Sequence, residues 1–438
     1  MDYNDAGQII QKTEMLSGGT QDTYVYGYDA RNRLTEVQKN GDVVEAYGYD
    51  ANGNRNLRTS TELGVINQAA THNTGDQLAA QGNVTYSYDS NARLSEKLLV
   101  DGENSELTTY VYDSVGRLKQ VDTPTKSIAY RHNALGNRVA KLVDGVLAEK
   151  YLWQDLTTLL ATYDGQGNLK QRFEHTLGHT PTSFTQGGQR YFIQTDHLGS
   201  PRVITNASGA VVKSIRYDSY GVVIEDSNPT FSIPFGFAGG LYDADTGLVR
   251  FGFRDYDPVI GRWTARDPIG FGGGDTNLYG YVLGSPVNWV DPNGLLKRTR
   301  NLNENERNQI EKAIKKLKCA GYSQGSENLT RMLNNNQIGV DENLMDGLGA
   351  LGEASRWFDN FNIVPELFNS ENLEYLPQTL AHEYAHLEER KGVPWRIIRN
   401  ILENFRLLDP EVNADLVSQQ VLERINNMKN SGNECECI

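Results

Sequence analysis

Cysteine, histidine and long apolar runs are all scarce in this chain of 438 residues. Its three cysteines, Cys319, Cys435 and Cys437, are too few for a disulfide framework. No apolar run approaches the roughly 20 residues that cross a bilayer, and the N-terminus lacks the basic and apolar segments of a secretory signal. We therefore expect no disulfide-rich fold, no stable membrane insertion and no signal peptide.

Positive charge is also in deficit. Asp and Glu number 56 against 42 Lys and Arg, which gives a net charge of −14. Because an acidic surface repels phosphate groups, we expect no nucleic acid among the partners. The stretch Cys435-Glu436-Cys437 could bind a metal or oxidise, or could simply belong to a frayed tail.

The composition of the chain changes near residue 295. Before this point, short runs of strand-forming residues alternate with Gly, Asp and Asn, and after it helix formers dominate. An apolar stripe with helical spacing runs from Ile310 to Leu317, after a start signal at Asn303-Glu304. The sequence therefore predicts a β-rich part followed by a part with helices.

The β-rich part is repetitive. Four segments share a Tyr-x-Tyr-Asp pattern that leads into a turn, and a fifth is a degenerate copy: Tyr26–Leu34, Tyr47–Arg55, Tyr86–Leu94, Tyr110–Leu118 and Tyr130–Arg138. They recur at intervals of about 20 residues or twice that. Each copy is typical of a strand, a turn and a second strand, so we expect hairpins stacked into one curling sheet. Its tyrosines could form a structural ladder or a carbohydrate-binding surface.

Four further motifs follow the repeats. They are DHLGSPR at Asp196–Arg202, RDYDPVIGRW at Arg254–Trp263, DPIGF at Asp267–Phe271 and DPNGL at Asp291–Leu295. Together with the repeats, they resemble the YD repeats of Rhs proteins and insecticidal-toxin C components over nearly all of residues 1–295. The resemblance implies a hollow β-shell around a C-terminal toxin. It also implies a C-terminal fragment or a reduced variant, because a family shell uses more repeats.

The resemblance further implies that the end of the shell is an aspartyl autoprotease. Asp267 and Asp291 would form a carboxylate pair in which one acid keeps its proton while the other activates water. The cut would fall between Leu295 and Leu296, and Arg266 could support a carboxylate or the scissile carbonyl. The alternative is that both aspartates only form Asp-Pro turns.

The C-terminal part contains His382-Glu383-Tyr384-Ala385-His386, an H-E-x-x-H motif. Residues four apart lie on one face of a helix, so His382 and His386 can reach one metal ion. Glu383 can then act as general base on a metal-bound water. No other histidine lies beyond His197, so a third ligand nearby must be a carboxylate or a cysteine. The alternative is a helix with two ordinary histidines.

An acidic motif, E-x-x-A-D, follows about 25 residues after the histidines. Its Glu411 and Asp415 lie on one face of a helix for which Asp409 and Pro410 are suitable starting residues. The two motifs together resemble those of gluzincin metallopeptidases. This resemblance implies that Glu411 is the third zinc ligand and that Asp415 orients a ligand histidine. Alternatively, Glu411 is an acid favoured by the helix dipole.

We therefore predict a β-rich YD-repeat shell of stacked hairpins, followed by a mainly α, α+β zincin-like domain. Residues 1–235 would form the shell segment, 236–295 the autoproteolytic core and 296–438 a zinc peptidase toxin. The implied partners are a protein substrate in the target cell, a cognate immunity protein and the spike or delivery proteins of a secretion system. The effector would be made in the bacterial cytoplasm without a signal peptide and delivered into target cells.

Two other functions remain open on the sequence alone. The C-terminal domain could be a toxin of another chemistry, such as a nuclease or an ADP-ribosyltransferase, although the acidic charge counts against a nuclease. The chain could also be a non-enzymatic YD-repeat surface protein that adheres to glycans or cells.

Overall fold

The computed structural model describes residues 1–4, 6–15, 21–176, 179–295, 299–301, 304–319, 329–330, 338–341, 352–354 and 361–363. The chain divides into two compact units, Met1–Leu296 and Lys297–Ile438.

One antiparallel sheet of 22 strands dominates the described part of the first unit. Each strand pairs with the next one along the chain, so the sheet is a meander of successive hairpins. The strands up to β11 are β1 (Asp2–Tyr3), β2 (Ile9–Met15), β3 (Gln21–Tyr28), β4 (Leu34–Lys39), β5 (Asp42–Tyr49), β6 (Arg55–Ser60), β7 (Val65–His72), β8 (Leu78–Gln81), β9 (Val84–Tyr88), β10 (Leu94–Asp101) and β11 (Asn104–Tyr112).

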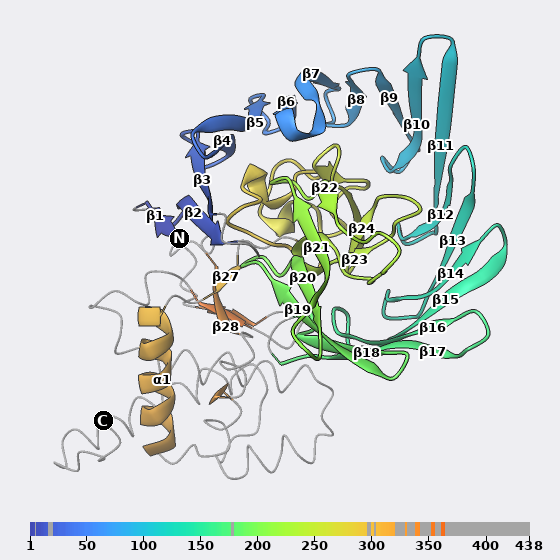
Figure 1. The fold of residues 1–438 in the computed structure, drawn as a ribbon. Helices are drawn as coiled ribbons and strands as arrows, with labels where there is room; N and C mark the ends of the chain where they lie inside the picture. The colour runs from blue at the N-terminus through green and yellow to red at the C-terminus, as the bar shows by residue number, and fades with distance from the viewer. Residues whose placement is uncertain are drawn as a thin grey trace, which may run out of the picture. The chain divides into compact units, whose positions relative to one another are not determined.

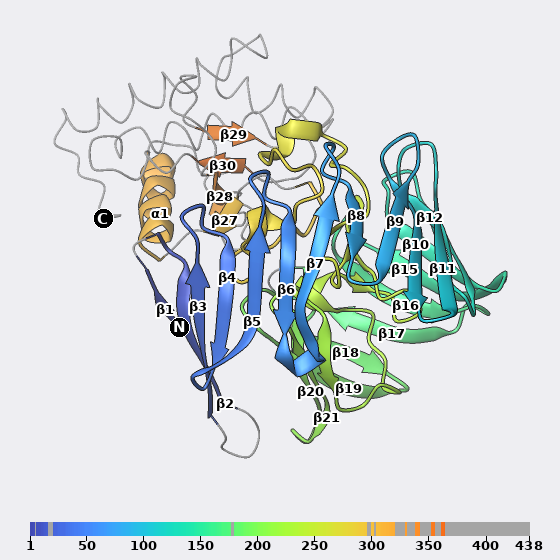
Figure 2. The ribbon, with the colours of Figure 1, turned by 90° about the horizontal axis from the view of Figure 1, so that it is seen from above.

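The later strands continue the meander with the same antiparallel pairing. They are β12 (Leu118–Asp122), β13 (Ser127–His132), β14 (Arg138–Val143), β15 (Val146–Trp153), β16 (Leu159–Asp164), β17 (Leu169–Glu174), β18 (Ser183–Gln186), β19 (Gln189–Thr195), β20 (Pro201–Asn206), β21 (Val211–Tyr217) and β22 (Val223–Asp226). A short 3-10 helix, η1 (Thr61–Leu63), interrupts the connection between β6 and β7. Figure 2 shows β3 to β8 side by side.

The aspartate of each repeat closes its own turn. Asp113 Oδ1 accepts hydrogen bonds from the backbone N–H groups of Val115 and Arg117, at 3.0 and 2.9 Å. Between them, Gly116 has φ of 87°, in the left-handed region that glycine adopts without strain. The third residue after the aspartate is left-handed in the other copies too, where it is Asn32, Gly53 or Ala92, so the copies share one turn geometry.

In three of the copies an arginine ends the turn and connects one repeat to the next. Arg117 Nε donates to Asp113 Oδ2 at 2.6 Å, and its Nη1 donates to the backbone oxygen of Asn133 in the following turn at 3.0 Å. Arg93 makes the same two contacts, with Asp89 and with the backbone oxygen of Asp113. The pattern recurs in the first repeat. We call this pair of contacts the turn clasp.

In several repeats the second aromatic residue bonds back to the preceding hairpin. The hydroxyl of Tyr49 donates to the backbone oxygen of Leu34 at 2.7 Å. Trp153 takes the same place in a later repeat and donates through Nε1 to the backbone oxygen of Arg138, also at 2.7 Å. These aromatic side chains therefore bond within the sheet, which favours the structural ladder over a carbohydrate-binding surface.

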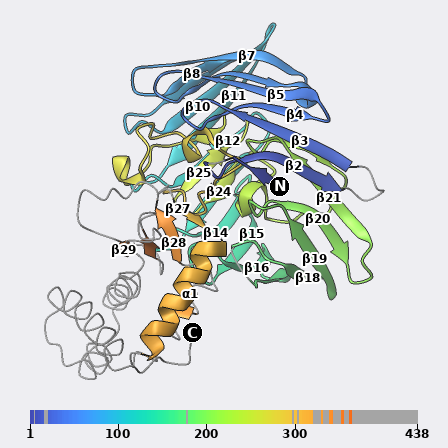
Figure 3. The ribbon, with the colours of Figure 1, turned by 90° about the vertical axis from the view of Figure 1, so that its left-hand side faces the viewer.

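The sheet curls, and the residues that follow β22 lie inside the curve. We call residues 236–295 the interior segment. It contains a small antiparallel sheet and three 3-10 helices: β23 (Leu241–Tyr242), β24 (Val249–Phe251), β25 (Arg254–Asp257), β26 (Arg262–Trp263), η2 (Phe237–Gly239), η3 (Gly270–Gly273) and η4 (Val282–Gly284). Figures 1 and 3 both show β24 enclosed between the early strands and β14 to β16.

Aromatic packing and buried charges hold the interior segment in place. Phe237, Phe251, Tyr256, Trp263 and Tyr281 form a buried cluster. Arg138 on β14 donates to Asp255 on β25 at 2.8 Å, and both side chains are about 2% exposed. Because breaking such a buried pair leaves an uncompensated charge, the pair fixes the position of the interior segment against the sheet.

The described residues of the second unit comprise one helix and a four-stranded mixed sheet. The helix α1 (Glu304–Cys319) buries Ile310, Ala313, Ile314 and Leu317, as the apolar spacing predicted. The strands β27 (Thr299–Asn301), β28 (Ile338–Asp341), β30 (Phe361–Ile363) and β29 (Gly352–Ala354) follow in this spatial order, with β28 and β30 parallel. None of the described helices has the length and apolar character that a bilayer crossing requires.

The turn clasp should contribute measurably to stability. Replacing Arg117 by Ala removes an ion pair and a hydrogen bond to the next turn, so we expect a loss of about 1 kcal/mol in the free energy of unfolding. Arg131→Ala, at an exposed position on β13, serves as the control and should change it by less than about 0.5 kcal/mol. Urea unfolding of both variants measures the difference, and equal midpoints would contradict a role for the clasp.

Candidate active site

Arg254 on β25 brings the two predicted aspartates together. Its Nη2 lies 2.9 Å from Asp267 Oδ2 and 3.3 Å from Asp291 Oδ2. All three residues are buried, with relative exposures of 4%, 9% and 4% for Arg254, Asp267 and Asp291. Two carboxylates from separate Asp-Pro motifs therefore share one guanidinium in the interior of the first unit.

Both aspartates also close turns with their other carboxylate oxygen. Asp267 Oδ1 accepts from the backbone N–H of Ile269 at 3.0 Å. Asp291 Oδ1 accepts from the backbone N–H of Leu295 at 3.0 Å. The two sequence interpretations, turn formation and a carboxylate pair, are thus compatible, because Oδ1 serves the turn while Oδ2 faces Arg254.

The residues before the predicted cleavage bond are held by the same groups. Arg254 Nε donates to the backbone oxygen of Gly294. Leu295, which is 7% exposed, is held through its N–H by Asp291. The main chain on the N-terminal side of the predicted cut is therefore anchored next to the two carboxylates, which is the positioning that a self-cleavage reaction requires.

The sequence suggested Arg266 as a support for a carboxylate or for the scissile carbonyl. It is exposed and forms a hydrogen bond with the Tyr279 side chain, whereas the guanidinium at the carboxylates is that of Arg254. Arg254 is the first residue of the RDYDPVIGRW motif, which the sequence analysis identified without assigning Arg254 a role at the aspartates.

Burial and charge oppose each other at this site. Burial raises the pKa of Asp267, while the Arg254 guanidinium and the Ile269 N–H act to lower it. Burial also lowers the pKa of Arg254, against the charges of Asp267 and Asp291. The net effect is an Asp267 carboxyl that keeps its proton to a higher pH than an exposed aspartic acid does, as a general acid needs to.

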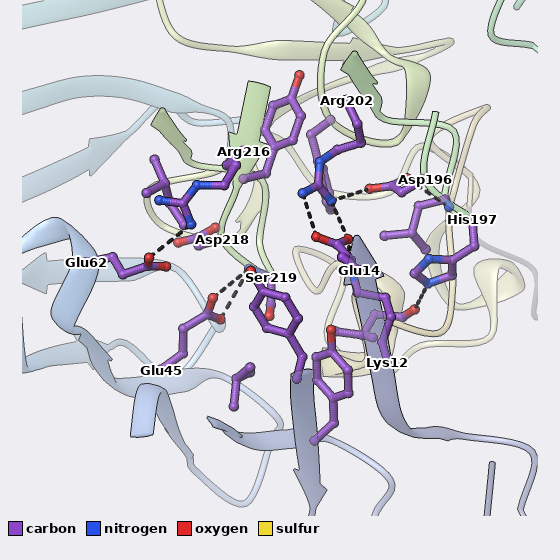
Figure 4. Close-up of a pocket in the computed structure, with 18 residues that line it drawn as sticks. Lys12, Glu14, Glu45, Glu62, Asp196, His197, Arg202, Arg216, Asp218 and Ser219 are labelled. Carbon is purple, nitrogen blue, oxygen red and sulfur yellow. Dashed lines mark hydrogen bonds and ion pairs between the residues drawn. The ribbon is translucent and has the colours of Figure 1, made fainter. Parts of the chain in front are cut away.

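A second group of charges joins the early strands to β20 and β21, as Figure 4 shows. Arg202 donates to both oxygens of Glu14, at 2.9 and 3.0 Å. Arg216 pairs with Glu62 at 3.0 Å. These residues border a cavity of about 50 Å³, room for only one or two water molecules. We call this group the seam.

The seam contains two buried carboxyl groups. Both oxygens of Glu45 lie 3.2 Å from the backbone nitrogen of Ser219, and the Tyr47 hydroxyl donates to Glu45 at 2.7 Å. The second carboxyl group, that of Asp218, pairs with Arg58 at 3.0 Å. Burial, together with the charge of Asp218, raises the pKa of Glu45 to about 7. Glu45 therefore changes its charge near neutral pH.

The DHLGSPR histidine also lies at the seam. His197 Nε2 is 2.7 Å from the backbone oxygen of Val287, a contact between the sheet and the interior segment. Burial lowers its pKa, so the ring is neutral at neutral pH. This geometry gives His197 a structural role, since its ring joins the turn before β20 to the interior segment.

The predicted zinc site falls outside the described residues, as does one side of the predicted cleavage bond. The positions concerned are Leu296, His382, Glu383, His386, Glu411 and Asp415. Among the residues that the structure describes, no group of three or more His, Cys, Asp or Glu side chains is arranged to hold a metal ion.

Comparisons with known proteins agree on the shell. Residues 1–272 match the family model described as Teneurin YD-shell. Teneurin-4 of Homo sapiens is 30% identical over 273 residues, which cover 60% of this chain and 10% of the teneurin. "Probable deoxyribonuclease RhsA" of Dickeya dadantii (strain 3937) is 30% identical over 327 residues, covering 65% of this chain and 22% of RhsA. The chain therefore spans only a small part of the relatives that it matches.

Among solved structures, the chain is similar to "Crystal Structure of TcdB2-TccC3-TEV". The TM-score is 0.40 and the sequence identity 18%, and the match covers 67% of this chain and 17% of that chain.

The seam should make the stability of the first unit depend on pH. Because the folded-state pKa of Glu45, about 7, lies above its ordinary 4.5, its contribution is fully present below pH 4.5 and is lost as the pH rises through 7. Wild type should therefore lose on the order of 2 kcal/mol from this group between pH 5.5 and 8.5. Glu45→Gln should remove most of that loss.

The matched control for this experiment is Glu62→Gln. It breaks an ion pair of the same seam, so it should shift the thermal midpoint by similar amounts at both pH values. A pH dependence of Glu45→Gln identical to that of wild type would show that Glu45 does not titrate in this range.

Proposed function

This chain belongs to the Teneurin YD-shell family, and from that premise we propose that it is an Rhs-type effector which cuts itself after Leu295 and releases a zinc peptidase toxin. The observation that carries the self-cleavage is the buried Asp267–Arg254–Asp291 arrangement beside the anchored Leu295. The relative whose printed name includes RhsA supports the toxin-shell role.

The cleavage reaction uses the two carboxyl groups in different protonation states. Asp291, ionised, takes a proton from a water molecule, whose oxygen attacks the carbonyl carbon of Leu295. Asp267, protonated, donates its proton to the leaving nitrogen of Leu296 as the C–N bond breaks. The products are a carboxyl group on Leu295 and an amino group on Leu296. Arg254 holds the Gly294 oxygen and both carboxyls in register throughout.

The proposed toxin activity rests on the spacing of the sequence motifs. His382, His386 and Glu411 would hold one zinc ion, Asp415 would orient a ligand histidine, and Glu383 would move the proton. Zinc, when bound, would polarise the substrate carbonyl and acidify water. The substrate would be a protein of the target cell. An immunity protein would protect the producing cell, and secretion-system proteins would deliver the effector.

A second candidate activity is DNA cleavage. The observation that favours it is the printed name of RhsA, a probable deoxyribonuclease. The acidic charge of this chain disfavours it, because DNA binding relies on phosphate contacts with Lys and Arg.

Self-cleavage is tested on denaturing gels of the full chain. Wild type should run as two fragments with a new N-terminus at Leu296, whereas Asp267→Asn, Asp291→Asn and Arg254→Gln should each run as one band. Arg266→Gln is the control, since Arg266 is exposed and the buried guanidinium at the carboxyls is that of Arg254, and it should cleave as wild type does. An uncut wild-type chain, or an uncut Arg266→Gln beside a cut Arg254→Gln, would contradict this assignment.

The zinc peptidase is tested by metal analysis and by toxicity in target cells. Wild type should contain about one zinc per chain. Glu383→Gln should keep the zinc and lose toxicity, while His382→Ala and Glu411→Ala should lose both. Undiminished killing by Glu383→Gln would exclude peptidase chemistry, and degraded DNA in the poisoned cells would establish the nuclease instead.

A further inference from the structure

Two of the five repeat copies bury an arginine where the other three bury a leucine. In every copy, the first strand residue after the turn pairs with the last residue of the strand before it. Leu118 pairs in this way with Tyr112 and is fully buried. Arg55 and Arg138 take the same place in their copies, with exposures of 9% and 2%. A guanidinium at an apolar core position costs desolvation free energy, so these two arginines need partners that the leucines do not.

The RDYDPVIGRW motif of the interior segment supplies hydrogen-bond acceptors for both arginines. Arg138 Nη2 donates to Asp255 Oδ1 at 2.8 Å. Arg55 Nη2 donates to the backbone oxygen of Val259 at 2.9 Å. The Arg138 guanidinium also lies over the ring of Tyr130, 3.5 Å from its centroid, which holds it in place from the side of the sheet. Two repeats that are far apart in the sequence thus bind one short motif of the interior segment.

The contact of Arg138 lies one residue from the carboxylate pair. Asp255 follows Arg254 on β25, where successive side chains point to opposite faces of the strand. Arg254 faces Asp267 and Asp291 on one side. Asp255 faces Arg138 on the other side. Because consecutive Cα atoms are held about 3.8 Å apart, a shift of Asp255 moves Arg254 with it.

We propose that Arg138 is a positioning residue of the self-cleavage site, which holds Arg254 between the two aspartates through its ion pair with Asp255. This inference rests on the proposed self-cleavage. Arg250 of the interior segment also pairs with Asp255, at 2.6 Å, so Asp255 keeps a cation when Arg138 is removed. Loss of Arg138 therefore loosens the attachment of β25 to the sheet without leaving Asp255 as a lone buried charge.

The test is Arg138→Leu in the full chain, produced by cell-free translation and stopped by denaturation at timed intervals. Leucine is the residue that three other copies bury at this place, so the sheet can accommodate it. Self-cleavage should slow at least roughly tenfold, because a small displacement of a positioned group lowers a rate by up to about 100-fold. Arg138→Lys keeps a cation for Asp255 and should cleave faster than Arg138→Leu does.

Stability, measured as the urea midpoint in the uncut Asp267→Asn background, separates positioning from folding. Arg138→Leu should have a midpoint equal to or above that of Arg138→Lys, since leucine suits an apolar core position and a lysine there must be desolvated. Cleavage rates and midpoints should therefore not rank the two variants in the same order. A merely structural role of Arg138 would give the same order in both measurements.

Arg117→Ala is the matched control from the neighbouring repeat. It removes a turn clasp, so it should lower the midpoint in the same background. It should also cleave at the wild-type rate, because Arg117 bonds to Asp113 and Asn133 within the sheet. Cleavage of Arg138→Leu at the wild-type rate, beside an uncut Asp267→Asn, would overturn the role of Arg138 alone, and so would the same order of rates and midpoints. An uncut wild-type chain would overturn both proposals.

Discussion

The hydrogen bond from an arginine to the backbone oxygen of the following turn is the contact on which the sheet depends. In the clasp of Arg117, one carboxylate closes its own turn and also holds the guanidinium that reaches Asn133. Aromatic groups such as Tyr49 bond in the opposite direction, to the preceding repeat. Repeats with both contacts are therefore bonded to both neighbours, and this lets the sheet extend along the chain without a separate core for each hairpin.

The interior segment depends on this sheet because it has little regular structure of its own. Its strands are short, and it is bound to the sheet by buried charge pairs such as that of Asp255 with Arg138. The sheet in turn encloses the aromatic cluster around Tyr256 and Trp263, which supplies apolar burial. The site at Arg254 exists only once both parts have assembled, since its three charged groups would be solvated in the separate pieces.

The carboxylate site and the seam both contain buried carboxyl groups, but their neighbouring charges give these groups different protonation behaviour. At Asp267, burial and the Arg254 guanidinium oppose each other, which suits an acid that must keep a proton and then release it. At Glu45, burial and the charge of the nearby Asp218 carboxylate raise the pKa to about 7, so the Glu45 side chain changes its charge near neutral pH. One arrangement suits proton transfer, whereas the other makes the contact between early and late strands sensitive to pH.

The sequence by itself determined the local structure of the shell: the repeated Tyr-x-Tyr-Asp turns, the antiparallel hairpins, and the helix that buries Ile310. These follow from short-range rules, since an aspartate closes a turn within four residues and apolar spacing marks a helix face. The family match confirms the predicted YD-repeat shell, while the zinc site stays a prediction. Only the tertiary structure decided that Arg254 rather than Arg266 meets the aspartates, and that Glu45 is buried near Asp218. Burial and long-range pairing depend on how distant strands pack, and no local pattern encodes them.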